Sequence, residues 1–457
     1  MRIAVIGGTA AGPAAAAEAA RQGAEVVLYE QNAHISVGAC EIPYVVAGQI
    51  EGGVEALEVL TPEEFEKSRG ATVRVQHRVV ALEPSKGRLV VESLIHRSRH
   101  DEAFDRFILA TGARARRLGV DGEAAPGVFS LRGLEDAAAL KTWLDTEPVR
   151  HVVVVGGGFV GLEMAEAMRD RAIRATILDT RGRVLGLDIA DPMIAPMHEA
   201  MRARGVHVRA EQVTAIETEA TGRVRAVRTN QGELIGCQAV IVAIGIEPRT
   251  ALAESAGVHL GETGAIAVDD AMRTNVRTVW ACGDVIEVPR VVDGNAVHWP
   301  LAPIGRRTAR VAARNAAGAR PADRFTGVTP SVAVRAFGIE AAHAGLSLDE
   351  ARASGFDAEA IMVQHWSRVK MVPGSKPLHV RYVVEQGSGR LLGGELVGAE
   401  GAALRANVLV PWIRAGTTVR EIAEEMDLVY NPPIAPATDP LRIAAAKAMR
   451  SVKGAGR

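Results

Sequence analysis

The sequence predicts an α/β protein of several domains, and three observations lead to this class. A strand–glycine loop–helix–strand unit near the N-terminus recurs farther along the chain, with Gly156 lying 149 residues after Gly7. After about Pro321 the glycine loops give way to an alternating strand pattern at 379–384 and to helical runs at 402–410 and 419–425. The length of 457 residues is that of about three domains, at roughly 150 residues each.

The first unit starts with an apolar strand, residues 2–6, and its second strand ends at Glu30. The first glycine permits a tight turn, and the third lets the helix pack closely against the strand. Amides at the start of such a helix can hold a pyrophosphate, and the terminal acid can bond a ribose hydroxyl. Thr9 stands where the Gly-x-Gly-x-x-Gly pattern has its middle glycine, so a turn without a ligand is the alternative. The candidate cofactor-binding residues here are Gly7, Gly8, Ala10, Gly12 and Glu30.

The second unit fits the glycine pattern fully, through Gly156, Gly158 and Gly161, and its second strand ends at Asp179. A single glycine loop is a weak signal, whereas a whole unit repeated in register strongly indicates dinucleotide binding. Two such sites imply electron transfer between two nucleotide cofactors. The sequence therefore predicts two Rossmann-type dinucleotide-binding domains followed by a separate α+β domain.

A third signal concerns the first cofactor. Residues 274–284 form a strand that enters a Gly-Asp turn, where the Asp284 carboxylate can accept hydrogen bonds from the ribityl chain of FAD. An ordinary strand-ending turn is the alternative. Two further strand-to-glycine turns, one with Thr111 and Gly112 and one at 243–248, are of the kind that closes nucleotide domains.

Composition and charge exclude other classes. The 53 Lys and Arg residues against 54 Asp and Glu leave a net charge of -1, which excludes a strongly basic nucleic-acid binder and gives no reason for a membrane partner. No spanning helix, signal peptide or metal site is predicted. Three cysteines cannot form a disulfide framework, which indicates a reducing cytoplasm.

Cys40 is the candidate reactive residue. Cys237 begins an apolar strand and Cys282 lies in the Gly-Asp turn, so both are most simply packing residues. Cys40 lies in a loop just beyond the first unit, where the chain is expected to pass over the flavin ring. This position favours a reactive thiol over the alternative of a buried structural cysteine.

The pattern of Ser36, Cys40, Pro43 and Tyr44, together with both glycine loops and Asp284, resembles the pyridine nucleotide–disulfide oxidoreductases. Within them it is most similar to single-cysteine coenzyme A disulfide reductase. Relatives with a Cys-x4-Cys pair are excluded, because the second position is Val45. Single-cysteine oxidases and peroxidases carry a His where this chain has Ala10, which leaves oxidase activity as an alternative.

The resemblance implies the mechanism and the assembly. NAD(P)H at the second glycine loop would reduce FAD beneath Phe159 and near Glu163, and Cys40 would then cleave the substrate disulfide. Ala302 lies in a turn that resembles the family's flavin-contacting turn. Tyr430 lies in a C-terminal signature that implies a homodimer in which this loop reaches the partner's active site. There Tyr430 could protonate the leaving thiolate, or it could simply pack at the dimer seam.

The residues at the end of the second unit indicate the preference between NADH and NADPH. Asp179 favours NADH, because a carboxylate bonds the ribose 2′-hydroxyl and repels a 2′-phosphate. Arg181 and Arg183 could soften that preference, so NADPH remains possible, or they could be ordinary solvated charges.

The residues around the substrate depart most from the family. Glu18 and Ala20 replace expected cations, Met371 and Val372 replace a Tyr pair, and Glu41 would disfavour the Cys40 thiolate. The substrate-binding candidates are Arg21, Ser36, Arg69 and Arg306.

These departures predict an NAD(P)H-dependent reductase of a small disulfide, persulfide or polysulfide whose thiol need not be coenzyme A. The alternatives are an oxidase or quinone reductase in which Cys40 only tunes the flavin, and a non-turnover redox sensor. We place the FAD-binding domain at 1–114 and 246–322, the NAD(P)H-binding domain at 115–245 and the dimerisation domain at 323–457.

Overall fold

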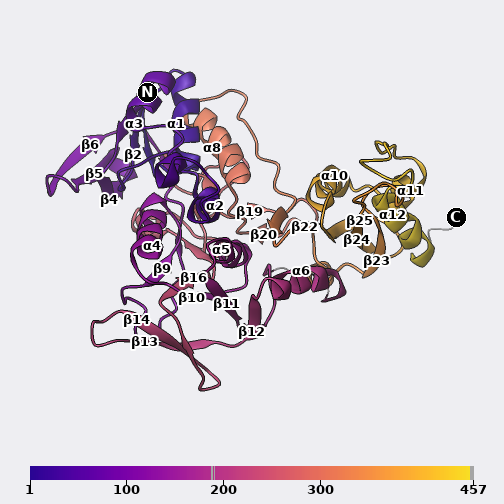
Figure 1. The fold of residues 1–457 in the computed structure, drawn as a ribbon. Helices are drawn as coiled ribbons and strands as arrows, with labels where there is room; N and C mark the ends of the chain where they lie inside the picture. Colours follow the sequence, from indigo (N-terminus) through magenta and orange to yellow (C-terminus); the bar gives the residue numbers. More distant parts are fainter. Residues whose placement is uncertain (187–188, 190, 453–457) are drawn as a thin grey trace.

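The computed structural model describes residues 1–186, 189 and 191–452, and these residues form three large sheets with their helices. Figure 1 shows the first sheet at the top (indigo), the second below it (magenta) and the third to one side (yellow). The α/β class with two Rossmann-type units and a C-terminal α+β part is confirmed by this arrangement.

The first sheet is parallel and is built around the first repeat unit. Its strands, in spatial order, are β18 (Val279–Ala281), β7 (Arg106–Leu109), β1 (Arg2–Ile6), β2 (Glu25–Tyr29) and β3 (Thr72–Arg74). Helices α1 (Ala11–Arg21) and α8 (Ala302–Ala316) pack against each other beside it. Because β18 and α8 follow the second unit in sequence, the chain leaves this sheet and returns to it.

The second sheet repeats the same parallel order. Its strands are β12 (His207–Ala210), β11 (Arg174–Asp179), β10 (His151–Val155), β16 (Ala239–Val242) and β9 (Val128–Ser130). Its helices are α4 (Leu134–Thr146), α5 (Phe159–Asp170) and α6 (Asp191–Ala203). All residues of β10 and all but the first of β1 are buried, as expected for central parallel strands that are covered on both faces.

The third sheet is antiparallel. Its strands are β21 (Ser331–Ala336), β22 (Ile339–Gly345), β25 (Leu391–Gly398), β24 (Pro377–Glu385) and β23 (Ala358–Trp366). The helices of this part are α9 (Leu348–Ala353), α10 (Ala402–Ala415), α11 (Val419–Glu424) and α12 (Pro440–Ser451). Its core includes Val380, Tyr382 and Leu396, which share the face covered by α10 and α12.

Smaller elements complete the chain. Two three-stranded antiparallel sheets are β4 (His77–Glu83) with β5 (Arg88–Ser93) and β6 (Ser98–Ala103), and β13 (Val213–Thr218) with β14 (Val224–Thr229) and β15 (Leu234–Gly236). Two short pairs are β8 (Ala113–Ala115) with β17 (Ile246–Pro248), and β19 (Val288–Pro289) with β20 (Ala296–Val297). The remaining helices are α2 (Ile42–Val46), α3 (Pro62–Arg69) and α7 (Ala251–Ser255).

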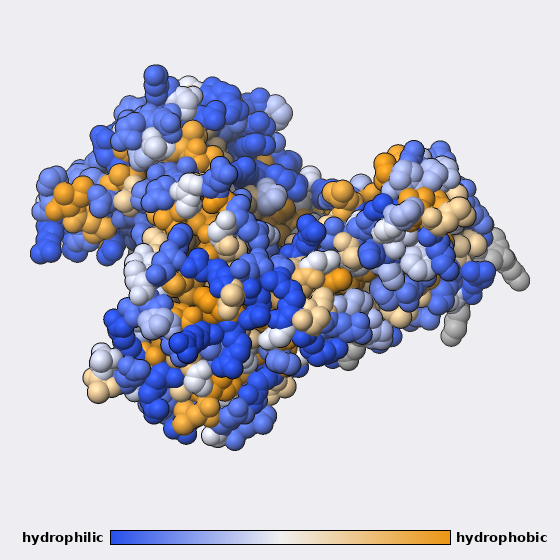
Figure 2. Space-filling view, viewed as in Figure 1, coloured by the Kyte–Doolittle hydropathy of each residue, from blue (hydrophilic) through white to orange (hydrophobic). Residues whose placement is uncertain are grey.

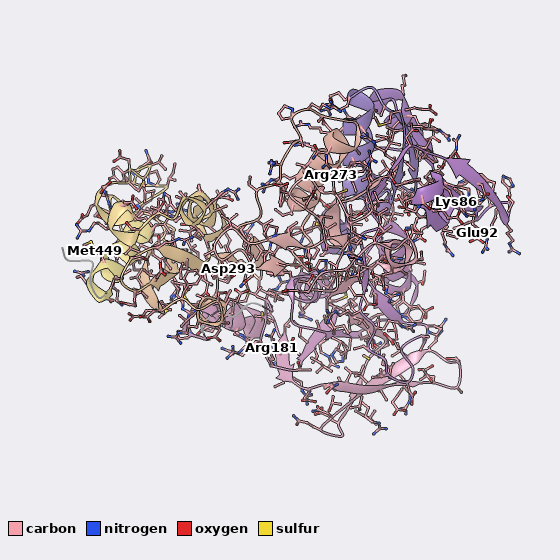
Figure 3. The ribbon with its side chains drawn as sticks, turned by 180° about the vertical axis from the view of Figure 1, so that it is seen from behind. Lys86, Glu92, Arg181, Arg273, Asp293 and Met449 are labelled. Atoms are coloured by element: carbon pink, nitrogen blue, oxygen red, sulfur yellow. The ribbon has the colours of Figure 1, made fainter. Side chains whose placement is uncertain are left out.

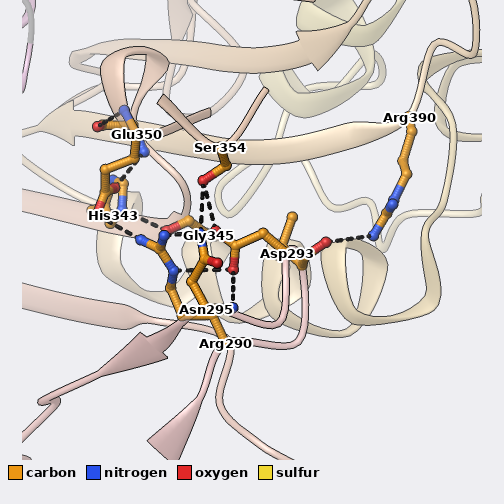
Figure 4. A network of polar contacts seen from close by, with 10 residues as sticks. Arg290, Asp293, Asn295, His343, Gly345, Glu350, Ser354 and Arg390 are labelled. Atoms are coloured by element: carbon orange, nitrogen blue, oxygen red, sulfur yellow. Dashed lines mark hydrogen bonds and ion pairs between the residues drawn. The ribbon is translucent and has the colours of Figure 1, made fainter. Parts of the chain in front are cut away.

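A buried polar network ties the β19–β20 turn to the C-terminal part (Figure 4). The Asp293 carboxylate accepts from Arg290 Nη2 at 2.6 Å and from Ser354 Oγ at 2.8 Å, and only 3% of its side chain is exposed. Arg290 Nη1 also donates to Glu350 Oε1 at 2.9 Å. Breaking a buried pair of this kind leaves a charge without compensation, so the network fixes how these two parts meet.

Figure 3 places Lys86 and Glu92 on the β4–β5–β6 sheet at one end of the molecule and Met449 on α12 at the other. On the face seen in Figure 2, hydrophilic residues predominate and apolar residues form small patches. Among the described residues, no helix is both long and apolar enough to span a membrane, and no group of three or more metal-ligating side chains gathers.

Candidate active site

The two glycine loops have the same hydrogen-bond pattern. Gly7 N donates to Tyr29 O at 2.9 Å, and Gly156 N donates to Leu178 O at 2.8 Å. The next amide in each loop donates to the acid that ends the second strand: Gly8 N to Glu30 Oε2 at 2.6 Å, and Gly157 N to Asp179 Oδ2 at 3.1 Å. Each acid therefore fixes its own loop, a structural role that sequence reasoning missed, and a carboxylate retains lone pairs for a further donor.

Gly12 and Gly161 allow the close packing of helix and strand. A Cβ at Gly12 would lie 1.6 Å from the Gly7 carbonyl oxygen, and one at Gly161 would lie 2.0 Å from the Gly156 carbonyl oxygen. Gly158 is different, because a Cβ there would meet no atom of the described residues within 4 Å. No contact within the described part of the chain requires glycine at this position, whereas close approach of a ligand to the backbone would require it.

Cys40 lies in a short turn, Ala39–Glu41, that leads directly into α2. The loop before it is tied to the first glycine loop through Ser36 N, which donates to Gly8 O at 2.9 Å. Gly38 N also donates to Leu57 O at 2.7 Å. Of the three cysteines, Cys40 is exposed, and Cys237 and Cys282 are buried. The structure thus presents one accessible thiol on a fixed loop beside the first glycine loop.

Charged groups from four parts of the chain act on this thiol. Although Cys40 is exposed, neighbouring atoms partly desolvate its sulfur and raise its pKa, and Glu41, Glu163 and Asp284 raise the pKa further. Arg132 opposes this effect. The structure therefore brings Asp284 and Glu163, which are 121 residues apart (284 − 163), to the same thiol.

Arg132 is a residue that sequence reasoning missed. Its Nη2 lies 3.2 Å from Asp284 Oδ2, and its buried Nε has no hydrogen-bond partner within the described chain. The Asp284 carbonyl oxygen also accepts from His298 Nε2 at 2.7 Å. Arg132 belongs to no sequence motif. It lies beside Asp284 only because the parts of the chain that hold the first and second sheets pack together.

Glu163 lies on the first turns of α5, one turn after the half-buried Phe159. Burial raises the pKa of its carboxyl to about 7, and the charge of Glu166 adds to this effect. The hydroxyl of Tyr44, on α2, donates to Glu163 Oε1 at 3.3 Å and opposes the increase. A contact therefore joins the helix that follows Cys40 to the helix that follows the second glycine loop.

Two of the substrate-binding candidates lie together. Arg21 and Arg69 line one surface pocket of about 230 Å³ with Ser68 and Gly70, beside α1 and α3. Arg21 Nη1 lies 2.5 Å from the Oε2 of buried Glu18. Arg306 lies exposed on α8, and neither it nor Ser36 is among the lining residues of this pocket.

The other candidates lie in four places. Thr111 Oγ1 donates to Arg249 O at 2.8 Å, and Gly112 follows with φ +66°, so both lie in the turn after β7. Ala302 is the first residue of α8, and Ala10 is the N-cap of α1. Tyr430 is 55% exposed on the segment between α11 and α12, which lies apart from α2 in Figure 1. Within this single chain, Tyr430 is not brought to Cys40.

Two parallel nucleotide-type sheets beside one accessible thiol define a class of two-cofactor oxidoreductases, and comparison with known proteins identifies the family. Residues 1–308 match the model of the pyridine nucleotide-disulphide oxidoreductases, and residues 330–441 match the dimerisation domain of that family. The chain belongs to this family, as the sequence motifs predicted, and is an NAD(P)H-dependent flavoprotein oxidoreductase.

Individual relatives resemble almost the whole chain. It is 33% identical over 446 residues to the NAD(P)H coenzyme A polysulfide/persulfide reductase of Pyrococcus horikoshii, with 97% of each chain covered. It is 28% identical over 442 residues to coenzyme A disulfide reductase of Staphylococcus aureus, covering 94% of this chain and 96% of that one. The solved structure of an NAD-dependent persulfide reductase from A. fulgidus superposes with a TM-score of 0.93 at 31% identity, over 99% of this chain and 83% of that chain.

Proposed function

We propose that this enzyme reduces a small disulfide, persulfide or polysulfide through Cys40, with electrons from NAD(P)H passing by way of FAD. The observation that carries the proposal is the one accessible thiol, on a loop fixed to the first glycine loop, where the charges of Glu163, Asp284 and Arg132 act on it. The names of the relatives, which include coenzyme A disulfide and persulfide reductases, support this substrate class. Cys40 is the proposed nucleophile.

The first site fits FAD. Arg132 Nε is buried and has no partner among the described residues, and the Asp284 carboxylate is partly exposed. They supply a donor and an acceptor suited to an anionic, hydroxyl-bearing dinucleotide. FAD, when bound, supplies a two-electron relay between a nicotinamide and a thiol. Amides at the start of α1 would hold the pyrophosphate, and Glu30 would accept from a ribose hydroxyl. The residues proposed to hold FAD are Gly7, Gly8, Ala10, Gly12, Glu30, Thr111, Gly112, Asp284 and Ala302.

The second site is proposed to hold the nicotinamide nucleotide, with NADH preferred. Gly156, Gly158 and Gly161 form its loop, with Phe159 and Glu163 toward the nicotinamide. Asp179 Oδ1 accepts from Arg181 N at 2.9 Å, so the carboxylate lies at the turn where the adenosine ribose is expected. Figure 3 labels Arg181, which follows β11 by two residues.

Asp179→Asn tests this preference. The variant keeps an oxygen for Gly157 N but loses the charge and the oxygen that accepts from Arg181 N. The ratio of kcat/KM for NADH to that for NADPH is therefore expected to fall by about tenfold, which corresponds to about 1.4 kcal/mol. Steady-state kinetics with both nucleotides measure the ratio, and Arg181→Ala should lower NADPH use alone. An unchanged ratio in a variant with unchanged thermal stability would exclude Asp179 as the specificity residue.

A coenzyme A-type substrate is supported by the pocket of Arg21 and Arg69 and opposed by two carboxylates. Glu18 already pairs with Arg21 and with Arg314, and Glu41 adds negative charge beside Cys40. Arg69 is therefore the stronger candidate for an anionic group of the substrate, and Ser36 and Arg306 remain candidates at the thiol and on α8. The proposed reaction is therefore defined by the sulfur–sulfur bond that is cleaved, and not by whether the thiol of the substrate is coenzyme A.

The proposed assembly is a cytoplasmic homodimer with the domain boundaries given above. The family's dimerisation domain matches 330–441, which suggests the dimer. The exposed Tyr430 is proposed to act in the partner's site, as the acid for the leaving thiolate or as a packing residue.

Two measurements test the proposed function. The first is turnover of NADH with coenzyme A disulfide, a coenzyme A persulfide, polysulfide and oxygen; at least one sulfur substrate is expected to be used at least about tenfold faster than oxygen. The second is mass spectrometry of the purified, non-reduced enzyme, in which an adduct on Cys40 identifies the thiol carrier. Turnover with oxygen alone, and no sulfur adduct, would contradict the proposal.

A further inference from the structure

Three carboxyl groups on α5 face α2, and two of them are well compensated. Glu166 Oε1 accepts from Phe337 N at 2.6 Å and from Arg204 Nη1 at 3.3 Å. Asp170 accepts from Gln49 Nε2 at 2.8 Å and from Arg204 Nη2 at 2.6 Å. Both groups therefore pair with Arg204 and accept from a second donor, although burial raises the pKa of Glu166.

Glu163, the third carboxyl, has no such cation. Its hydrogen-bond partner is Tyr44, and among the described residues neither an arginine nor a lysine contacts it. Glu163 lies with Pro43, Tyr44 and Ala47 around a small cavity of about 10 Å³ between α2 and α5. Glu163 is half-buried, and its partial burial raises the pKa of its carboxyl to about 7, so its charge changes near neutral pH.

Helix α2 connects this group to the thiol. Tyr44 follows Cys40 by four residues, about one helical turn, so the Tyr44–Glu163 contact lies beside the Cys40 loop. The charge of Glu163 also acts directly on the Cys40 thiol. The other charged groups that act on Cys40 are Glu41, Asp284 and Arg132, and those that act on Tyr44 besides Glu163 are Glu166 and Arg335.

We propose that Tyr44 is a positioning residue that acts through Glu163 to control when Cys40 becomes a thiolate. Cys40 and Glu163 share one negative charge: a proton lost from Cys40 Sγ is balanced by one gained at Glu163, so thiol plus carboxylate become thiolate plus carboxylic acid. The Tyr44 hydroxyl stabilises the carboxylate and so keeps the thiol protonated at rest. This inference rests on the proposed role of Cys40 as the nucleophile.

The pH dependence of Cys40 alkylation in the holoenzyme tests the sharing of charge. Iodoacetamide reacts with the thiolate, intact mass follows the modification, and Cys237 and Cys282 are buried. Glu163→Gln removes the charge, so the midpoint of the alkylation profile should fall by about one pH unit and the rate at pH 8 should rise by about tenfold. Tyr44→Phe should shift the midpoint in the same direction by less, because Glu163 then stays neutral to a higher pH.

A double variant and a matched control make the result specific. In the Glu163→Gln background, Tyr44→Phe should cause no further shift. Asp170→Asn neutralises a carboxyl on the same helix that is already paired, and it should leave the profile unchanged. An unshifted Glu163→Gln profile, or an equal Tyr44→Phe shift in both backgrounds, would overturn the proposal.

The two possible failures are distinguishable. Alkylation needs no turnover, so it reports on the charge coupling even if Cys40 is not the nucleophile, whereas disulfide turnover by Cys40→Ser reports on that role alone. If Tyr44→Phe loses its flavin absorbance, Glu163→Gln by itself decides whether the charge is shared.

Discussion

Replacing Cys40 by serine is expected to lower kcat/KM for the sulfur substrate at least about a thousandfold, because a serine hydroxyl cannot form or release a mixed disulfide. Reduction of the flavin by NADH should stay within about twofold, since the second glycine loop and Glu163 are unchanged. Steady-state oxidation of NADH measures the first quantity, and anaerobic bleaching of the flavin absorbance in a stopped-flow instrument measures the second.

Cys237→Ala is the matched control for this variant. Cys237 is fully buried, burial raises the pKa of its thiol to about 12, and it lies between β15 and β16, so its loss should leave turnover unchanged. Sulfur turnover by Cys40→Ser at the wild-type rate would rule out the thiol mechanism. Oxygen or quinone consumption that survives the loss of Cys40, without sulfur turnover, would favour the oxidase alternative.

Gly156 and Gly158 lie in one loop, but substitution by alanine is expected to affect them differently: the first variant should lose stability and the second should lose NADH binding. Gly156 has φ +105°, and a Cβ there would lie 2.4 Å from the Ala243 carbonyl oxygen, so Gly156→Ala both strains and overpacks the loop. We expect it to cost about 2–4 kcal/mol. The added methyl group of Gly158→Ala would meet no atom of the described residues within 4 Å. This variant should leave thermal stability unchanged, while it weakens NADH binding by about tenfold or more.

Thermal unfolding of the nucleotide-free proteins and titration with NADH separate these effects. Gly156→Ala should unfold at a temperature about 4–8 °C lower, on the scale of about 2 °C per kcal/mol. If Gly158→Ala binds NADH as tightly as the wild type, the second glycine loop does not hold the pyrophosphate where we propose. If Gly158→Ala is instead the unstable variant, other atoms occupy the space beside Gly158 in solution.

The repeated unit was predictable because its signals are local. A strand of buried Val and Ile, a glycine with positive φ and a third glycine against the strand are each specified by a few consecutive residues. The offset of 149 residues is reproduced by the parallel strand order, with β10 and β11 in the places of β1 and β2. The roles assigned to individual ligand-binding residues remain predictions.

The surroundings of Cys40 were only partly predictable. The loop, the cysteine and Glu163 belong to motifs, but Arg132 belongs to none, and Tyr44 was noted only as part of a pattern. Both act through contacts between elements that are far apart in sequence: Arg132 with Asp284 over 152 residues, and Tyr44 with Glu163 over 119. Sequence periodicity carries no information on such pairs, since they depend on how two sheets dock.

By itself, the sequence determined the α/β class, the two glycine loops and the single candidate thiol, because each depends on backbone geometry or residue chemistry within a short stretch. Only the tertiary structure decided which charges surround that thiol, that Glu18 neutralises Arg21, and that Glu163 has a tyrosine rather than a cation as its partner. The physical reason is that the charge state of a side chain depends on its burial and its neighbours, and both arise only when distant parts of the chain pack together.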